Sequence, residues 1–386
     1  MKIMLISGEY PPRIGGVADY TCHLAQALAR LGHHVSVLTT ANGRSDGWAM
    51  EAGDHVEVYP DVRDWGVRGA ASISARVRDL TPDVIDFQYV PHMYGRGGFA
   101  PGAAILPLRL RRLSSATIVS TVHEIASPWS LKPRRAFAAA AHRVQALLLA
   151  IASDHCIVTN QRYARQMRKW TRSGSALHEI PVGAGIEPVP LSEPERESLR
   201  SALARKDGQA MGDLSALSVD KRPEDLIAVL SSLDRRAQLT LLGGLAVDQR
   251  RRQWFMDRAA SAGLAERVRW ADALSSADLS RDLYALDVYI HTHSAGASTR
   301  STTLASALAH GLPVVAYRGA ETSPLFVDGE NILLAPQGDV LALIEGVQRL
   351  LDSPDLRARL SRGARDLYLR CLTWDSIARQ FLGAVS

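Results

Sequence analysis

Short β-rich apolar runs alternate with amphipathic helical stretches along almost the entire chain, and no other feature limits the fold as strongly. Between the runs lie stretches such as "DYTCHLAQALARLG" (19–32), whose apolar residues recur every three or four positions. This alternation predicts βα units and parallel sheets. The runs in the first half of the chain are "KIMLISG" (2–8), "HVSVLTT" (34–40), "HVEVYPD" (55–61), "DVIDFQYV" (83–90), "TIVSTVHE" (117–124), "DHCIVTN" (154–160) and "HEIPVG" (178–183).

The rhythm stops once, at the polar, proline-bearing segment "GAGIEPVPLSEPERE" (183–197), which is typical of a linker between domains. A chain of 386 residues is too long for one compact core and fits two domains. We therefore expect two doubly wound domains in tandem, with a ligand site in the cleft between them. The runs after the linker are "AMGDLSAL" (210–217), "QLTLLGG" (238–244), "RVRWADA" (267–273), "DVYIHTH" (287–293) and "LPVVAYRG" (312–319).

Composition excludes several classes of protein. Hydrophobic residues make up 46% of the chain and charged residues 22%, as expected for a globular protein rather than a disordered one. No apolar run reaches the length of about 18 residues that a membrane span requires. The start, "MKIMLISGEYPP", has too short an apolar run for a signal peptide and is expected to form the first strand. Three widely separated cysteines (Cys22, Cys156, Cys371) suit a reducing cytosol and have no metal-ligand spacing.

Positive charge is in modest excess and gathers in the first half. The net charge of +5 favours anionic partners without choosing among them. Basic clusters stand at "RLRRL" (109–113), at "KPRR" (132–135) and on one helical face formed by Arg162, Arg165, Lys169 and Arg172. Solvated faces are one interpretation, and peripheral contact with an anionic membrane surface is the other. Nucleic acid is not expected, because the clusters lack interleaved aromatic residues.

Glycines mark the first loop as a candidate anion site. In "SGEYPPRIGGVADYT" (7–21), Gly15 and Gly16 precede a helix and let backbone N–H groups approach an anionic group. The alternative is an ordinary turn. The pattern is not G-x-G-x-x-G, so neither a nicotinamide nor a flavin cofactor is expected.

Two further segments carry polar side chains at the ends of expected strands. "STVHEIASP" (120–128) places His123 and Glu124 at the carboxyl edge of a sheet, where a histidine can bond a sugar hydroxyl, titrate near neutral pH, or serve structure alone. "GDLSALSVDKRPEDL" (212–226) places Lys221 and Arg222 before a helix. That pair suits a diphosphate, although a solvated basic pair is the alternative.

Taken together, these motifs resemble the retaining glycosyltransferases of family 4, which have the GT-B fold. The resemblance covers nearly the whole chain. It is carried by "GEYPPRIGGVADYTCHLAQALARLGHHVSVLT" (8–39), "TVHE" (121–124), "IPVGAGIE" (180–187), "GDLSALSVDKRPEDLI" (212–227), "ALAHGLPVVA" (307–316) and "DGENILLAPQGD" (328–339).

The resemblance implies an acceptor domain over residues 1–186 and a nucleotide-sugar domain over residues 187–366. It also implies a C-terminal helix, 367–386, that returns to the first domain. His123 would contact the transferred sugar, while Gly15 and Gly16 would face the diphosphate and the acceptor. No metal or other cofactor is expected, since a nucleotide diphosphate sugar is the donor substrate. Glu124, Arg222, Ser298, Thr299 and Ser306 complete the expected substrate contacts, and Lys221 and Arg300 the expected catalytic set.

The chain departs from the family pattern in the stretch "SAGASTRSTTLASALAHGLPVVAY" (294–317), which contains no acid. The family commonly has two glutamates ahead of "GTPVVA", and Ser298 and Ser306 stand at those positions. The family's phosphate-binding arginine is replaced by Asp213, although Lys221 remains. A subset of the family resembles the chain more closely, with a motif like "QYVPHMYGRGG" (88–98) and an Arg-bearing loop of this kind.

Loss of both acids leaves two interpretations. Stabilising the departing diphosphate is the largest task of a transferase of this kind, and cations and helix N-termini perform it. Arg300 is expected to enter the pocket with no acid beside it and to bind the diphosphate or an acidic sugar. The alternative is that Arg300 points to solvent at a helix start. We therefore expect a cytoplasmic hexosyltransferase acting on a glycan, lipid-linked or small-molecule acceptor. The rival is a catalytically degenerate relative that serves as a partner or scaffold for another transferase.

Overall fold

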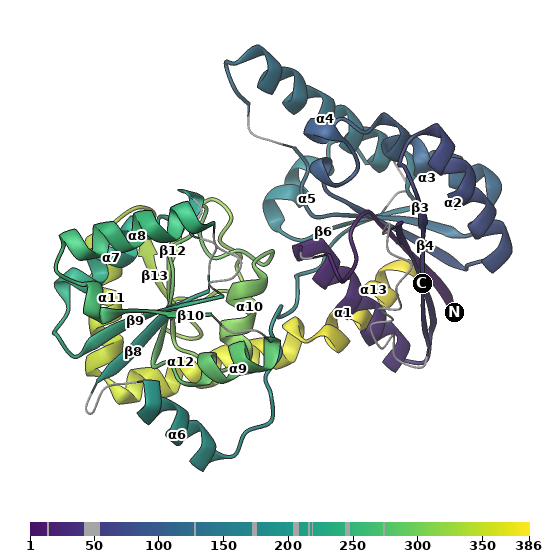
Figure 1. Cartoon of the computed structure of the whole chain (residues 1–386). Helices are drawn as coiled ribbons and strands as arrows, with labels where there is room; N and C mark the ends of the chain where they lie inside the picture. The colour runs from purple at the N-terminus through teal and green to yellow at the C-terminus, as the bar shows by residue number, and fades with distance from the viewer. Residues whose placement is uncertain are drawn as a thin grey trace. The chain divides into compact units, whose positions relative to one another are not determined.

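The structure is a computed structural model, and it describes residues 1–13, 15–41, 55–126, 129–171, 176–203, 208–214, 217, 219–243, 248–272 and 275–386. The chain forms two compact units (Figure 1). Unit 1 comprises Met1–Pro181 and Trp374–Ser386, and unit 2 comprises Val182–Thr373. Each is described by itself below.

Unit 1 is built on a seven-stranded sheet in the order β3-β2-β1-β4-β5-β6-β7. Every neighbouring pair is parallel, as the alternation of runs and helices predicts. Chain order reverses between β1 and β4, which leaves a gap between the loops at their carboxyl ends. The strands are β1 (Lys2–Ser7), β2 (His34–Thr40), β3 (Val56–Val62), β4 (Val84–Tyr89), β5 (Thr117–Val122), β6 (His155–Val158) and β7 (Ala176–Glu179).

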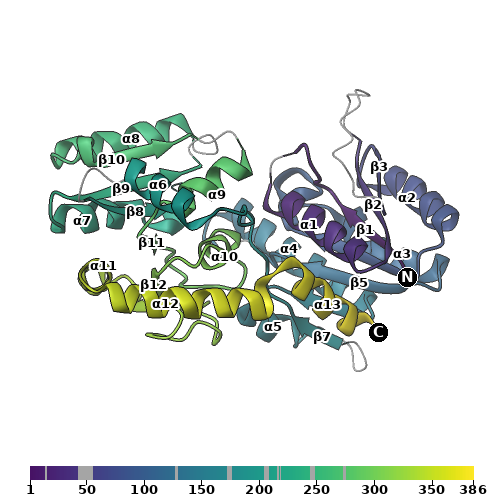
Figure 2. The ribbon, with the colours of Figure 1, turned by 90° about the horizontal axis from the view of Figure 1, so that it is seen from below.

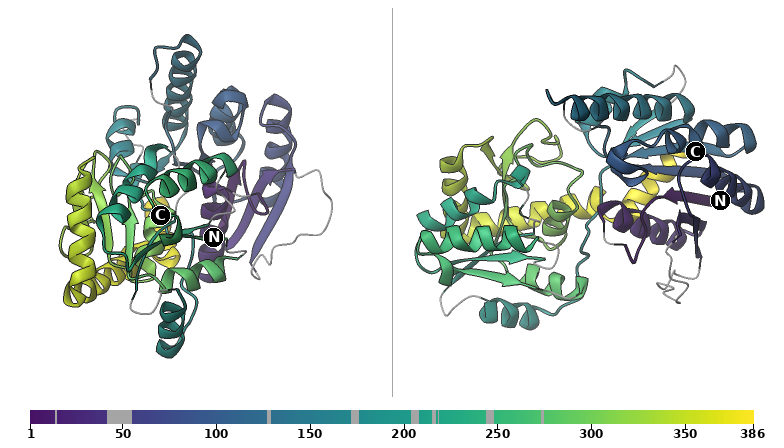
Figure 3. Two further views of the ribbon diagram at one scale, coloured as in Figure 1. Left: turned by 60° about the vertical axis from the view of Figure 1, so that its left-hand side comes forward. Right: turned by 45° about the horizontal axis from the view of Figure 1, so that its top comes forward.

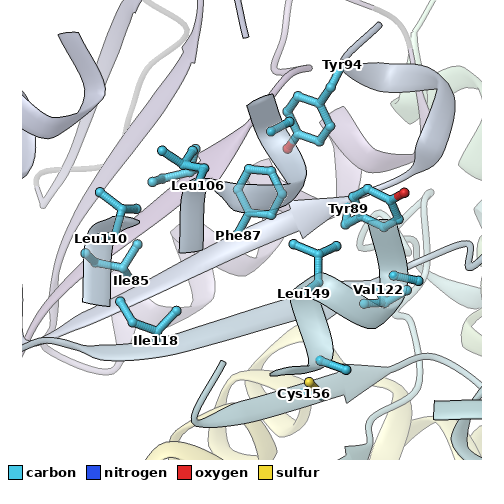
Figure 4. Packing of buried hydrophobic residues seen from close by; sticks show 14 of the residues in the cluster. Ile85, Phe87, Tyr89, Tyr94, Leu106, Leu110, Ile118, Val122, Leu149 and Cys156 are labelled. Carbon is cyan, nitrogen blue, oxygen red and sulfur yellow. The ribbon is translucent and has the colours of Figure 1, made fainter. Parts of the chain in front are cut away.

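Helices cover both faces of this sheet. One face carries α2 (Val67–Leu80), α3 (Pro101–Leu113), α4 (Pro133–Ala152) and α5 (Gln161–Met167), and the other carries α1 (Gly16–Arg30). The first face is packed by alternate strand residues such as Ile85, Phe87 and Tyr89, which meet Leu106 and Leu149 from the helices (Figure 4). Since a strand's side chains alternate between faces, Asp86 and Gln88 point to the opposite side.

The last helix, α13 (Trp374–Val385), belongs to unit 1 although it ends the chain. It packs beside α1, and the two run side by side in Figure 2. Trp374 is buried, stacks on the His23 ring at a centroid distance of 5.0 Å and meets the edge of Tyr20. Burial of its apolar face explains why a separate helix after residue 373 returns to the first unit.

Unit 2 contains a six-stranded parallel sheet in the order β10-β9-β8-β11-β12-β13. Chain order reverses between β8 and β11 in the same way as in unit 1. The strand β13 (Leu333–Pro336), inside "DGENILLAPQGD", is absent from the runs predicted from sequence. The others are β8 (Gln209–Asp213), β9 (Ala237–Leu242), β10 (Val268–Ala271), β11 (Val288–His291) and β12 (Val314–Arg318).

Helices flank the sheet of unit 2 on both faces, with the green strands between them in Figure 3. The helices α7 (Pro223–Ser232), α8 (Gln249–Ser261) and α11 (Val340–Asp352) pack on one face. The other face carries α9 (Ser276–Tyr284), α10 (Thr302–Ala309) and α12 (Pro354–Leu367). A further helix, α6 (Glu193–Leu203), precedes β8 and lies against α9.

The divisions between units differ slightly from those expected after residues 186 and 366. Val182 N donates to Thr299 O at 2.9 Å, and Ile186 N donates to Ser306 Oγ at 3.0 Å. These bonds attach residues 182–186 to unit 2. A π-helical turn, Tyr368–Leu372, continues α12 within unit 2, so only the chain from Trp374 onward joins unit 1.

Candidate functional site

Chemistry-bearing side chains lie at the carboxyl ends of the strands next to each order reversal. In unit 1 these are the ends of β1, β4 and β5, and in unit 2 the ends of β8 and β11. Open α/β sheets bind ligands at such reversals because the adjacent loops diverge there. The two sets are described separately.

His123 directly follows β5 and is held from two sides. Its backbone N–H donates to Tyr89 O at 3.0 Å, and its ring Nε2 lies 2.7 Å from Gln88 Oε1. The edge of the Tyr20 ring packs against the imidazole, with centroids 4.6 Å apart. Burial lowers the pKa of His123 to about 4, so the ring is neutral near pH 7. Of the three roles considered for this residue, titration near neutral pH does not fit the structure, whereas a neutral hydrogen-bonding role and a structural role both do.

Gly15 and Gly16 stand where α1 begins, as expected, and a carboxyl group lies beside Gly15. A Cβ added at Gly15 would lie 2.5 Å from Glu9 Oε2, whereas one added at Gly16 would meet no atom within 4 Å. Asp19 lies in the first turn of α1. Burial raises the pKa of both Glu9 and Asp19. These two acids oppose an anion at this helix start, so the geometry does not favour the diphosphate contact expected for the glycines.

Glu124 follows His123 and is partly buried. Its charge contributes to the raised pKa of Tyr89, whose hydroxyl is buried without a hydrogen-bond partner in the described part of the chain. Glu124 therefore lies near Tyr89, the last residue of β4, which follows Gln88.

In unit 2, Lys221 ends a short 3₁₀ turn, Val219–Lys221, after β8. The hydroxyl of Thr292 donates to its carbonyl oxygen and so attaches this turn to the end of β11. Burial is the main cause of the lowered pKa of both His291 and His293, and the positive charge of Lys221 lowers both pKa values further. No described carboxylate forms an ion pair with the Lys221 ammonium.

Arg222 is engaged differently from its neighbour. Its guanidinium pairs with Asp225 through two bonds, Nε to Oδ2 at 2.5 Å and Nη2 to Oδ1 at 3.1 Å, and Tyr317 also donates to that carboxylate. This pairing fixes the start of α7. The structure thus does not favour the diphosphate contact expected for Arg222, since its charge is already neutralised.

Arg300 has an acid beside it, and the expectation that it has none is wrong. Its Nε donates to Glu321 Oε2 at 2.8 Å. The loop after β12 lies along the loop after β11, because Glu321 N donates to Ala295 O at 2.8 Å and Ser323 N to Ala297 O at 3.0 Å. Residues 294–317 contain no acidic side chain, and Glu321 from the next loop provides the carboxylate beside Arg300.

Ser298, Thr299 and Ser306 are all nearly inaccessible to solvent. Ser298 Oγ lies 3.5 Å from the backbone N of Arg300, near the hydrogen-bond limit. Ser306 has no exposed surface, and its hydroxyl donates to Thr302 O and accepts from Ile186 N. This placement does not favour a substrate contact for Ser306, which instead holds the 182–186 segment on α10.

His293 stands at the centre of the group in unit 2. Burial is the main cause of its lowered pKa; the charges of Arg300 and Lys221 lower the pKa further, and those of Asp220 and Glu321 raise it. Its Nε2 is 3.2 Å from Asp220 Oδ2. Lys221 and Arg300 thus both act on the His293 ring, and a shared catalytic role for them stays a prediction. Within the ranges that the structure describes, no group of three or more His, Cys, Asp or Glu side chains is placed to hold a metal ion.

Sequence reasoning missed Asp220, Glu321 and four further residues of these two groups. Asp86 and Gln88 stand in a strand otherwise composed of apolar and aromatic residues, and this polar interruption was the available signal. His291 and His293 alternate in "DVYIHTH" at a strand end, which was a second signal. His291 is buried, and its Nε2 has no hydrogen-bond partner among described residues.

Two family models match the chain. The model described as "Glycosyl transferase 4-like domain" matches residues 15–183, and "Glycosyl transferases group 1" matches residues 195–367. The two matches fall in unit 1 and unit 2, respectively, and together they span most of the sequence.

Curated relatives are similar over nearly their whole length. A "GDP-mannose-dependent alpha-(1-6)-phosphatidylinositol monomannoside mannosyltransferase" of Mycolicibacterium smegmatis is 25% identical, with 96% of this chain and 95% of the relative covered. A "Glycogen synthase" of Mycobacterium tuberculosis is also 25% identical, with 98% and 92% covered.

Solved structures share the fold. The Anabaena protein HepE in complex with UDP-glucose has a TM-score of 0.75 at 18% identity, with 99% of this chain and 98% of that chain covered. Sucrose-phosphate synthase from Thermosynechococcus elongatus has a TM-score of 0.73 at 19% identity, with 99% and 97% covered.

Proposed function

This chain belongs to the family 4 glycosyltransferases, and we propose that it moves a hexosyl group from a nucleotide diphosphate sugar to an acceptor with retention of configuration. The observation that carries the proposal is the packing of the loops that bear Lys221 and Arg300 at the carboxyl ends of β8 and β11. Ser294 N donates to Asp220 O at 2.7 Å and Glu321 N donates to Ala295 O at 2.8 Å, while Arg300 pairs with Glu321. Cations placed there meet the negative charge that develops on a departing diphosphate.

Lys221 and Arg300 have different roles in this proposal. Lys221 is the cation without a carboxylate partner among the described residues, so it offers a full charge to the diphosphate. Arg300 is neutralised in part by Glu321, and the ion pair fixes its guanidinium at the edge of the group. A paired guanidinium retains further N–H donors for a phosphate or sugar oxygen.

His123 contributes a hydrogen bond rather than a proton. With a pKa lowered to about 4, the imidazole is neutral at the pH of a cytosol. It therefore serves in this proposal as a fixed polar contact for the transferred sugar.

The acceptor is proposed to be a glycan, a lipid-linked sugar or a small molecule with a free hydroxyl. The named relatives support this range, since one acts on a phosphatidylinositol mannoside and another is a glycogen synthase.

We also propose that unit 1 contacts an anionic membrane surface from the cytoplasmic side. At the start of α4, Trp129, Leu131 and Phe137 are exposed, and Phe99 packs on Phe137 with ring centroids 6.2 Å apart. Exposed cations stand among them at Lys132, Arg134 and Arg135. Aromatic residues beside cations are typical of proteins that lie on the interface of acidic membranes.

The basic clusters expected from sequence differ in whether exposed aromatic residues lie beside them. The cluster at 132–135 is the one joined to exposed aromatic residues, whereas Arg111 of the 109–113 cluster pairs with Asp154. Arg162, Arg165 and Lys169 are exposed, and Arg172 lies outside the described residues. By length and mean hydropathy, one described helix, Pro133–Ala152, is long and apolar enough to cross a membrane, and 39% of its apolar 18-residue stretch is buried within the protein.

A donor panel tests the proposed activity. The full chain is incubated with UDP-, GDP- and TDP-sugars, and release of the nucleoside diphosphate is followed with and without candidate acceptors. Slow hydrolysis or transfer from one donor, lost in Lys221→Met, is the expected result. Folded protein that binds and cleaves no donor would overturn the proposal and favour the scaffold alternative.

A further inference from the structure

We propose that Asp86 and Gln88 are positioning residues that hold His123 as its Nε2–H tautomer, so that the ring presents Nδ1 to the substrate as a hydrogen-bond acceptor. The assignment of His123 to the sugar rests on the proposed function. The tautomer itself depends only on contacts within unit 1.

The three residues form one continuous buried chain of polar groups. Thr121 Oγ1 donates to Asp86 Oδ1 at 2.8 Å, and Gln88 Nε2 donates to Asp86 Oδ2 at 2.5 Å. Gln88 Oε1 then lies 2.7 Å from His123 Nε2. Asp86, Gln88 and Thr121 have no exposed surface, so no solvent competes for these bonds.

The Asp86 carboxylate determines which group donates and which accepts in each hydrogen bond of this network. An ionised carboxylate only accepts hydrogen bonds, so the Gln88 group facing Asp86 must be its NH₂. Its oxygen therefore faces His123, and an oxygen requires a donor opposite it. The hydrogen of the neutral ring must then be on Nε2. This assignment follows from the network and does not require that hydrogen atoms be located.

The far end of the ring is left for a ligand. His123 Nδ1 makes no hydrogen bond to any residue in the described part of the chain. The Tyr20 ring, at an interplanar angle of 76°, packs against the imidazole and limits its rotation. Two fixed contacts thus determine both the plane of the ring and the identity of its acceptor nitrogen.

Stability of the fold alone does not explain why Asp86 and Gln88 form this buried hydrogen-bonded network. Asp86 and Gln88 stand on β4, where apolar side chains would pack against α1 without the cost of burying a carboxyl group. Burial raises the pKa of Asp86 to about 7. The consequence of retaining both residues is specific: Nδ1 can accept a hydrogen bond from a hydroxyl, but it cannot donate one to a carbonyl or phosphate oxygen.

The test observes the tautomer directly. The full chain is produced with nitrogen-labelled histidine, and proton–nitrogen correlation spectra are recorded at about pH 8, where Asp86 is ionised. The His123 signals are assigned by their loss in His123→Asn. We expect protonated Nε2 and unprotonated Nδ1. Protonated Nδ1 in the wild-type protein overturns the inference, whether or not the protein transfers sugar.

Two variants test the positioning residues. Gln88→Met preserves volume but removes both polar atoms, and Asp86→Asn offers an amide that donates or accepts. We expect a mixture of tautomers in each variant and a kcat/KM lowered by roughly 10- to 100-fold. A pure Nε2–H tautomer in both variants contradicts the inference. The matched control is Ser120→Ala, on the neighbouring strand β5, which removes a buried hydroxyl bonded to Ser153 at the end of α4 and should leave the tautomer unchanged.

The measurements separate this inference from the proposed function. If no donor is cleaved by the wild-type protein, the proposed function fails while the tautomer spectra remain decisive. If donor is cleaved but the variants keep the wild-type tautomer and rate, the proposed function stands and the positioning role is refuted.

Discussion

Arg300 Nε donates to Glu321 Oε2 at 2.8 Å, and only 3% of the Glu321 side chain is exposed against 34% of the Arg300 side chain. The acid-free stretch 294–317 therefore receives a carboxylate from the next βα loop. The partner is nearly buried, so it is not screened as a surface carboxylate is. In the loop after β11, the Arg300 guanidinium is therefore held by Glu321, which lies outside the stretch 294–317.

Arg300→Ala is expected to destabilise unit 2 by about 1–3 kcal/mol, because it removes the guanidinium that pairs with the buried Glu321 carboxylate. Donor affinity should fall roughly tenfold or more through loss of the guanidinium. Urea unfolding and nucleotide-sugar binding measure the two effects. Arg300→Ala combined with Glu321→Gln should recover stability but not donor binding, and recovery of both would remove Arg300 from the site.

Lys221 and Arg222 are adjacent, yet opposite outcomes are expected for them. Lys221→Met should weaken binding of a nucleoside diphosphate by roughly tenfold or more, because it removes an unpaired cation. Arg222→Met should mainly lower stability, since it breaks the bidentate pair with Asp225. Calorimetric titration with UDP and GDP distinguishes them. Equal losses of affinity would mean that Arg222 also binds the diphosphate.

Acidification is expected to destabilise unit 2. Burial lowers the pKa of His291 to about 3 and of His310 to about 4. Between these values and the ordinary value of about 6.5, the unfolded chain takes up protons that the folded chain does not, so stability falls as pH falls. At about pH 5 each residue should cost about 2 kcal/mol relative to pH 7.

The variant His310→Gln should flatten this dependence. The His310 ring lies 2.7 Å from both Ser280 Oγ and Ser306 O, so glutamine loses some hydrogen bonding at every pH. The slope of unfolding free energy against pH between about 6.5 and 5 is the diagnostic quantity. An unchanged slope in the variant would show that His310 titrates normally.

Membrane binding should depend on the exposed aromatic residues of α4. Phe137→Ser, at a side chain that is 68% exposed, is expected to lower binding to phosphatidylglycerol vesicles by roughly tenfold. Co-sedimentation in low and high salt provides the measurement. The control is Leu341→Ser, a residue that is 69% exposed on α11 of unit 2. Equal binding by both variants, or equal binding to uncharged vesicles, contradicts the proposed contact.

The final helix should be required for the stability of unit 1. Phe381→Ala removes a buried ring from the face of α13 that packs on unit 1, and a cost of about 3–5 kcal/mol is expected. Gln380→Ala, next to it on a more exposed side, should cost less than about 1 kcal/mol. Urea unfolding followed by a probe in unit 1 tests this prediction.

Much of the fold follows from local sequence patterns. The period of the apolar residues separates strands from helices, and a parallel sheet is the arrangement that joins strands through intervening helices. All the expected runs that lie in described residues contain strands. The strand β13 escaped because four residues, "LLAP", give too short a run and stand inside a glycine-rich motif.

The sites followed from sequence only where residues are neighbours in the chain or at a strand end. His123, Lys221 and Arg300 could be placed at carboxyl ends of strands from sequence order alone. The partners of these residues could not, because Gln88, Asp225 and Glu321 reach them through strand pairing or loop packing. A charge is neutral or available according to what surrounds it, and a pattern of residues contains no such distances.

The sequence by itself determined a chain of two doubly wound halves with the motifs of a glycosyltransferase. Only the tertiary structure decided which polar groups remain available. It paired Arg222 with Asp225 and Arg300 with Glu321, buried Ser306, and placed a carboxylate and an amide behind His123. The physical reason is that side-chain periodicity is a local property of the chain, whereas ionisation, desolvation and hydrogen bonding depend on residues brought together from distant positions.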